Sequence, residues 1–278
     1  MLSPRHAATA STTTRLLWAT DLHLDNAGSG GLARITNKIA ESDCDAALLT
    51  GDISSAPSLC DHLKILARAC RPSPLYFVLG NHDYYGGFMS RTHREIGSLC
   101  RSTPNLFFLD ETGPVPLGDD TALVGHSGWA DAACGWGTKT VIHTPDHDCI
   151  QDFRQLCTEA RFRKMQNLGR LSVKSIRKKL FAAFRTYKHV VVATHVPPFP
   201  STAVYEGKPC GPCHQPHFIN LGMGTMLIAV ANNNPTRRIT VLSGHTHSAA
   251  RQSILPNLHA RVGRARTGNP HVQGILHI

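Results

Sequence analysis

The sequence lacks any long apolar segment. Residues 1–14 are rich in Ala, Ser and Thr and contain no apolar core of the kind that a secretory signal peptide needs. The apolar run that follows, residues 16–19, is far shorter than the roughly 20 residues of a membrane-spanning helix. We therefore predict a short disordered leader over residues 1–14, a cytoplasmic location and no membrane partner.

A disulfide framework is also missing. The nine cysteines are odd in number and spread over 278 residues, whereas disulfide-stapled domains are short and dense in cysteine. Free thiols in a reducing compartment are the simpler interpretation. Cys210 and Cys213 form a Cys-x-x-Cys pair before His214, but no export signal supports haem attachment, and a Pro/Gly loop does not suit a thioredoxin motif. We interpret the pair as incidental, with a small metal clip including His214 or His217 as the alternative.

Acidic residues are absent from one segment. Residues 161–188 contain ten Lys or Arg side chains and no Asp or Glu, and this excess equals the net charge of +10 of the whole chain. A solvated helix face is the usual explanation of such a run. The alternative is a track for the phosphate backbone of nucleic acid, although the aromatic residues of the segment have the spacing of a buried helical stripe.

The sequence does contain a regular alternation of short apolar runs and helix-like stretches, in a globular composition with 41% hydrophobic residues. Apolar runs bounded by Gly and polar residues suit strands buried on both faces. The expected strands are 16–19, 45–49, 75–79, 189–193 and 239–242, and the expected helices are 32–41, 58–71, 91–101, 171–187 and 218–231. The fold class is therefore α/β, and without a visible linker or repeat we predict one domain, residues 1–278.

Each predicted strand ends in a polar cluster. The clusters hold eight candidate site residues: Asp21, His23, Asp52, Asn81, His82, His195, His245 and His247. Because ligands of such sheets bind beyond the carboxyl ends of the strands, one fold can bring these side chains together. Carboxylate, amide and imidazole donors without thiolate suit Mn, Fe, Zn or Co better than Ca, and argue against a structural zinc site.

The spacing within these clusters suggests how metal ions would be shared. In an extended strand end, residues i and i+2 point the same way, so Asp21 and His23 would grip one ion, and His245 and His247 would reach a shared site. The single carboxylate of Asp52 could bridge two ions. Two neighbouring ions can clamp a phosphate and activate a water molecule, which predicts a hydrolase of phosphate esters.

The order of these motifs resembles the five signature motifs of the calcineurin-like metallophosphoesterase superfamily. The motifs are Asp21-x-His23, Gly51-Asp52, Gly80-Asn81-His82-Asp83, His195 and Gly244-His245-x-His247, and the resemblance spans residues 15–248. The fold that it implies is a four-layer α/β/β/α sandwich of two mixed β-sheets flanked by helices. It also implies two divalent metal ions and a metal-bridging hydroxide as nucleophile.

The resemblance implies a role for each motif residue. One metal would be bound by Asp21, His23, Asp52 and His247, and the other by Asp52, Asn81, His195 and His245. His82 would lie over the substrate phosphate and assist the leaving group, and Asp83 would orient His82.

The departures from the superfamily pattern narrow the function. Phosphoprotein phosphatases carry Asp-Arg-Gly after the second motif and Glu after Asn-His, where this chain has Ile-Ser-Ser-Ala-Pro at 53–57 and Asp83. The chain is closer to the small phosphodiesterases and nucleases. We predict hydrolysis of phosphate mono- or diesters, with a nuclease that uses segment 161–188 as the alternative. A non-catalytic scaffold ranks last, because all eight candidate positions are kept.

The segment 124–152 is expected to form a strand and then a long loop, and a loop of this length is usually functional or mobile. Within it, His126, Trp129 and Asp131 would either wall a substrate pocket or serve packing and a turn. Tyr84 and Tyr85, beside the third motif, would either stack on an aromatic substrate group or pack in the core.

Overall fold

The computed structural model describes residues 13–278. The predicted leader therefore lies almost entirely outside the described residues. Its last residue, Thr14, is held by two backbone hydrogen bonds with Ile278, at 2.9 and 3.0 Å. None of the helices in residues 13–278 is both long enough and apolar enough to cross a lipid bilayer.

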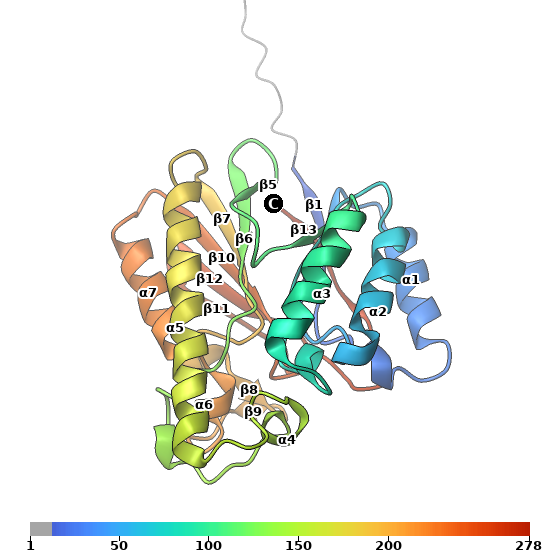
Figure 1. Cartoon of the computed structure of the whole chain (residues 1–278). Coiled ribbons are helices and arrows are strands. Elements are labelled where there is room, and N and C mark those ends of the chain that lie inside the picture. The colour runs from blue at the N-terminus through green and yellow to red at the C-terminus, as the bar shows by residue number, and fades with distance from the viewer. Residues whose placement is uncertain (1–12) are drawn as a thin grey trace, which may run out of the picture.

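Two β-sheets pack face to face in the centre of the molecule (Figure 1). The first has the strand order β13-β1-β2-β3-β4 and comprises Val272–His277, Arg15–Ala19, Ala46–Thr50, Leu75–Val78 and Leu106–Phe108. The second has the order β11-β12-β10-β7-β6-β5 and comprises Ala250–Leu255, Leu258–Val262, Arg238–Ser243, His189–Ala193, Thr121–Gly125 and Val115–Pro116. The sheets are mixed, because β13, β11 and β5 run antiparallel to their neighbours.

Helices cover the outer face of each sheet. The first sheet is covered by α1, α2 and α3, which are Gly31–Ala40, Ala56–Ala69 and Met89–Ser102. The second is covered by α5 and α7, which are Thr158–Ala183 and Leu221–Asn232. The short elements α4, α6, β8 and β9 gather at one end of the sandwich and are Asp146–Cys149, Gln215–Phe218, Val204–Tyr205 and Lys208–Pro209. The predicted four-layer α/β/β/α sandwich is confirmed.

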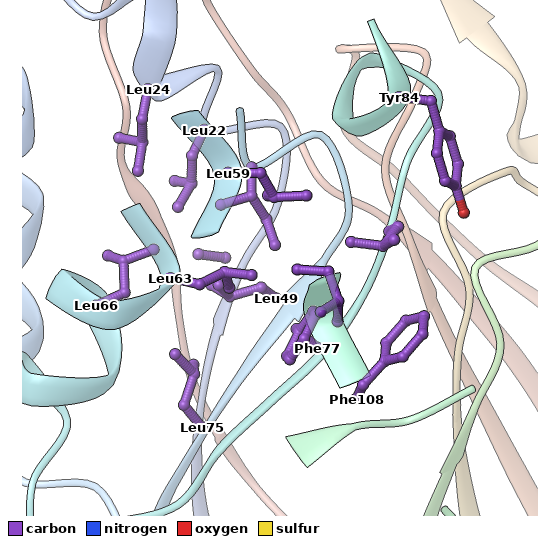
Figure 2. Packing of buried hydrophobic residues seen from close by; sticks show 14 of the residues in the cluster. Leu22, Leu24, Leu49, Leu59, Leu63, Leu66, Leu75, Phe77, Tyr84 and Phe108 are labelled. Carbon is purple, nitrogen blue, oxygen red and sulfur yellow. The ribbon is translucent and has the colours of Figure 1, made fainter. Parts of the chain in front are cut away.

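The continuous apolar runs of the sequence follow from this layering. Successive side chains of a strand point to opposite faces, so Leu17 and Leu49 pack under the helices, whereas Leu16 and Leu48 fill the space between the sheets. Figure 2 shows the first of these cores, in which leucines of α2 meet Phe77 of β3. Because both faces of such a strand are buried, its sequence is apolar throughout and does not alternate with polar residues.

Most predicted elements lie within a few residues of the observed ones, but β4 and β5 were not predicted, and β6 begins at Thr121, before the expected segment 124–152. The second half of the chain differs at two further places. The helix expected at 171–187 is α5, which begins 13 residues earlier, at Thr158, and ends at Ala183. The strands β11, β12 and β13 were not predicted, because their side chains mix charged and apolar residues without a run of either.

The basic segment lies mostly on α5, and its side chains divide into two kinds. Arg170, Lys174 and Lys178 are exposed, as expected of a solvated face. Lys179 is buried, and its ammonium group donates hydrogen bonds to the carbonyl oxygens of Leu109, Asp110 and Gly125 at 2.6, 3.1 and 2.8 Å. Lys179 therefore links α5 to the ends of β4 and β6 and is unavailable to a partner.

Candidate metal centre

The candidate ligands come from loops at the carboxyl ends of five strands, three in one sheet and two in the other. Asp21 and His23 follow β1, Asp52 follows β2, and Asn81 follows β3; His195 follows β7, and His245 and His247 follow β10. The structure brings all seven predicted metal-ligating residues to one end of the sandwich, so that both sheets contribute.

The acidic and imidazole side chains form two groups that share one carboxylate. The first contains Asp21, His23, Asp52 and His247, and the second contains Asp52, His195 and His245. Within each group, one potential ligand atom from every residue lies within 4.8 Å of all the others. The shared residue, Asp52, is buried and places its two oxygens 3.8 Å from His23 Nε2 and 3.3 Å from His195 Nε2.

The donor set fits a pair of divalent cations. The Nε2 atoms of His23 and His247 lie 3.0 Å apart, and Nε2 of His247 lies 3.5 Å from Oδ1 of Asp21, so imidazole nitrogens and carboxylate oxygens converge on one point. Oxygen and imidazole nitrogen donors suit Mn, Fe, Zn or Co. The cluster thus indicates a dinuclear centre.

The backbone that presents these ligands differs from the expected extended strand ends. Asp21, His23, Asp52, His245 and His247 all have φ between 42 and 73°, in the left-handed region that side chains other than Gly rarely adopt. Strain of this kind persists only where surrounding structure holds it, and it gathers at functional sites. The i, i+2 argument assumed an extended backbone and was therefore wrong in its mechanism, although His245 and His247 both line the cavity of the centre and fall in different groups.

Two glycines leave room for the carboxylates. A Cβ atom on Gly80 would collide with Oδ1 and the backbone nitrogen of Asp52, and one on Gly244 would collide with Oδ2 of Asp21. The backbone N–H groups of His82 and His245 in turn donate to Asp52 and Asp21, each at 2.9 Å. Gly80 of the third motif and Gly244 of the fifth motif thus allow the close approach on which the positions of the Asp52 and Asp21 carboxylates depend.

Burial and charge set the protonation of the centre. Although burial opposes ionisation of Asp52, the neighbouring His195, His82 and His23 hold its pKa well below the usual range. Burial and the nearby His195 lower the pKa of His245 to about 3, which keeps that imidazole in the neutral form that can bind a metal. For His195, burial is outweighed by Asp52, which raises the pKa to about 10, so cation binding must displace that proton.

Asn81 is oriented by a residue that the sequence did not reveal. Its Oδ1 lies 3.2 Å from His195 Nε2, and its Nδ2 donates to Oδ1 of Asp146 at 2.7 Å. The same carboxylate oxygen accepts from the hydroxyl group of Tyr85, also at 2.7 Å. Asp146 is the first residue of α4 and lies in the segment 124–152, where the length of the predicted loop was the only signal that could have pointed to it.

His82 stands over the two groups with its side chain partly open to solvent. Its Nε2 lies 4.0 Å from Oδ2 of Asp52, and the exposed fraction of the side chain is 32%. The ring stacks on Tyr85 with the centroids 4.2 Å apart, and meets His23 edge-on at 4.5 Å. His82 thus lies beside the shared carboxylate and lines the same cavity as Asp52, Asn81 and His247.

A family comparison agrees with this geometry. The model of the calcineurin-like phosphoesterases matches residues 14–249, which is most of the chain. The chain belongs to the calcineurin-like phosphoesterase family. The predicted enzyme class, a metal-dependent phosphoesterase, is thereby confirmed.

Solved structures share the fold of this phosphoesterase. A phosphopantetheinyl hydrolase from Mycobacterium tuberculosis is 12% identical with a TM-score of 0.61, and the alignment covers 92% of this chain and 91% of that one. A dimetal phosphatase from Danio rerio is 12% identical with a TM-score of 0.55, covering 90% and 86%. TT1561 of Thermus thermophilus is 13% identical with a TM-score of 0.52, covering 91% and 90%. At such identities the likeness concerns the fold, and a search of curated proteins found no match.

Asp83 of the phosphoesterase contacts the backbone of two ligand loops. It is fully buried, and its oxygens accept hydrogen bonds from the backbone N–H groups of Ile53, Ser54 and Gly80 at 2.8, 2.9 and 2.7 Å. These groups belong to the loops that carry Asp52 and Asn81. The carboxylate thus ties two ligand loops together.

The other singled-out residues of the phosphoesterase serve mainly structure. Trp129 is buried and stacks on Phe153, and Asp131 accepts from the N–H groups of Ala133 and Gly222. These contacts agree with the packing interpretation of the loop. Within residues 13–278, the thiols of Cys210 and Cys213 belong to neither group of potential metal ligands.

Proposed function

We propose that this phosphoesterase hydrolyses small phosphate mono- or diesters with two divalent cations, of Mn, Fe, Zn or Co. The observation that carries the proposal is the sharing of the buried Asp52 carboxylate between two groups of potential ligands. One shared carboxylate fixes two cations a few ångströms apart, which is the spacing needed to hold both the attacking and the leaving oxygen of a phosphate. Ligands drawn from both sheets support treating residues 13–278 as a single domain.

Each site residue has a task in this scheme. Asp21, His23, Asp52 and His247 would hold one cation, and Asp52, Asn81, His195 and His245 the other. When bound, the cations supply Lewis acidity toward the phosphate and lower the pKa of a water molecule. His82 faces the same space and would donate a proton to the leaving oxygen. Asp83 would act on His82 indirectly, by fixing the loop of Gly80 and Asn81.

The cavity in front of the centre favours a small substrate. It encloses about 320 Å³. Its wall beyond the ligands is formed by Tyr85, His143, Tyr205, His214 and Phe218. Histidine and tyrosine side chains can hydrogen-bond phosphate oxygens, and the flat rings accept an aryl or base group by stacking. A phosphate ester with one ring-bearing group suits this space.

The test is a pair of substitutions with a matched control. Asp52→Asn and Asn81→Ala should each abolish Mn-dependent turnover of aryl phosphate and aryl phosphodiester substrates while leaving the far-ultraviolet circular dichroism unchanged. Asp25→Asn, an exposed carboxylate near the first motif, should keep full turnover. If both site variants hydrolyse the substrates as fast as the control, the dinuclear mechanism is wrong.

A nuclease remains the second candidate because the exposed basic residues of α5 form a continuous face for a phosphate backbone. Arg163, Arg170, Lys174, Arg177 and Lys178 are all exposed. Binding of single-stranded DNA should then weaken steeply with added salt, and more so in the unmodified chain than in a variant with three of these residues changed to Gln. A lack of affinity at low salt would remove this candidate.

A further inference from the structure

A second cavity lies between the two sheets, away from the metal centre. It encloses about 500 Å³ and is bounded on one side by the end of the chain, residues 275–278, and on the other by strands of the second sheet. His189 is the first residue of β7, whereas the metal-ligating His195 follows the last. Six residues at roughly 3.3 Å each place the two sites about 20 Å apart. In Figure 1 the mark C lies at this end of the sandwich, opposite α4 and α6.

The inner face of the second sheet is apolar over some strands and polar over others. Over β6 and β7 it carries Leu123, Val191 and Ala193, which pack against the first sheet in the ordinary way. Over β11, β12 and the first part of β10 the inward positions carry polar and basic side chains: Arg238, Thr240, His259, Arg261, Arg251 and Ser253. Leu242, further along β10, belongs to the apolar part. The outward neighbours of the polar and basic residues on β10 and β12, such as Val241 and Ala260, are buried under α7. The far part of the space between the sheets thus has a cationic lining that is open to solvent, because Arg238, Arg251 and Ser253 are exposed and His259 and Arg261 are half-buried.

No carboxylate side chain balances these cations. The side chains that line the cavity include three arginines and three histidines but no Asp or Glu, and the main-chain carboxylate of Ile278, the last residue of the sequence, also borders it. No ion pair within residues 13–278 includes Arg238, Arg251 or Arg261, and residues 1–12 contain no acidic residue that could supply one. Arg251 and Arg261 are directly opposite each other in the β11–β12 ladder. Like charges directly opposite destabilise a sheet, so an anion between them would relieve a cost that the fold otherwise bears.

The cavity is also organised by hydrogen bonds. Arg238 donates to Nδ1 of the buried His189 at 3.0 Å, and Nε2 of that ring pairs with the hydroxyl group of Thr240 at 2.9 Å. On the neighbouring strands, Ser253 Oγ pairs with His259 Nδ1 at 3.0 Å. Edge strands do carry inward-pointing charges that prevent pairing with other chains. That device would explain Arg251 on the edge strand β11, but leaves the basic residues of β10 and β12 unexplained.

We propose that this inter-sheet cavity binds a small, multiply charged phosphate anion. The planar guanidinium groups of Arg238, Arg251 and Arg261 match the paired oxygens of phosphoryl groups. The volume accommodates two or three linked phosphates. Because the cavity is about 20 Å from the metal centre, its occupant is a ligand distinct from the ester under hydrolysis.

Calorimetric titration with sodium tripolyphosphate tests the proposal. The full chain carrying Asn81→Ala is used, so that phosphate binding at the metal centre is suppressed. We expect one saturable site that binds tripolyphosphate more tightly than orthophosphate. Adding Arg251→Gln and Arg261→Gln should weaken binding about a hundredfold, or tenfold for each lost charge-assisted contact. Adding Lys174→Gln and Lys178→Gln, which remove the same charge from exposed α5, should change it less than twofold.

The alternatives give different results. The proposal is overturned by absence of saturable binding, by equal weakening in the arginine and lysine variants, or by unchanged affinity together with self-association of the arginine variant, which would mean edge protection only. To show that the arginine variant is folded, the same two substitutions are made in the chain that keeps Asn81, which should still hydrolyse an aryl phosphodiester. A variant with Arg251→Lys and Arg261→Lys should retain part of the affinity for tripolyphosphate. ATP bound as tightly as tripolyphosphate would indicate a nucleotide as natural ligand, and weaker ATP binding an inorganic polyphosphate.

Discussion

Replacing Asp146 by Ala tests whether a residue outside the signature motifs completes the metal centre. The substitution removes the acceptor that holds Nδ2 of Asn81 at 2.7 Å and thereby fixes which end of the amide faces His195. A hydrogen bond to a charged group contributes about 1.5–3 kcal/mol. A loss of about 2 kcal/mol corresponds to a fall of about thirtyfold in metal affinity, which agrees with the 10–100-fold typical of residues that orient metal ligands.

The assay is turnover of an aryl phosphodiester as Mn²⁺ is titrated into metal-free protein. Asp146→Ala should require about thirtyfold more metal for half-maximal activity and recover much of its activity at saturation. Asp148→Ala is the matched control, because Asp148 lies on the same short helix but is exposed and pairs with His143 at 2.7 Å. If the two variants need the same Mn²⁺ concentration, Asp146 does not orient Asn81 and the reasoning fails.

Three further outcomes follow from contacts described above. Lys179→Met should lower the melting temperature by roughly 6–12 °C, since it removes a charged donor from three buried carbonyls at a cost of about 3 kcal/mol. The control Lys178→Met, on the exposed side of the helix, should shift the melting temperature by less than about 2 °C. Equal shifts of the two variants in a thermal melt would contradict this. Gly80→Ala should eliminate turnover by displacing the bridging carboxylate, while Gly113→Ala, where a Cβ meets no atom within 4 Å, should not; full activity of the first variant would refute the close approach. Burial lowers the pKa of His189 to about 4 from 6.5, so the unfolded chain takes up this proton first and stability is lost as the pH falls from 6.5 toward 4; urea unfolding at pH 7 and pH 5 should show a smaller loss in His189→Gln than in the unmodified chain, and an equal loss would argue against a neutral, buried imidazole.

The metal-ligand clusters could be predicted because each follows an uninterrupted apolar run. A strand such as β7, buried on both faces, leaves a sharp boundary between Ala193 and the polar residues that follow. Parallel strands then deliver these boundaries to one edge. Sequence order alone thus located residues as distant as Asp21 and His247, although the left-handed backbone at both positions depends on neighbouring loops and has no signature in residue type.

The parts that were missed lack such a boundary. The strands β11 and β12 carry Arg251, His259 and Arg261 at inward positions, so neither contains the continuous apolar run from which the other strands were predicted. The first turns of α5 are similarly masked, because charged side chains surround the buried Phe162 and Met165. Asp146 acts through a contact across 65 residues with Asn81, and no local pattern encodes such a contact.

Because the ligands come from loops of both sheets, bound cations would also act as cross-links between the two halves of the sandwich. Neither half could separate without releasing them, so unfolding of the whole chain would be linked to the free metal concentration. For one metal site, a free metal concentration a hundred times the dissociation constant adds about 2.7 kcal/mol to the free energy of unfolding. The resistance of this enzyme to heat would then report the metal supply of its surroundings as directly as its catalytic rate does.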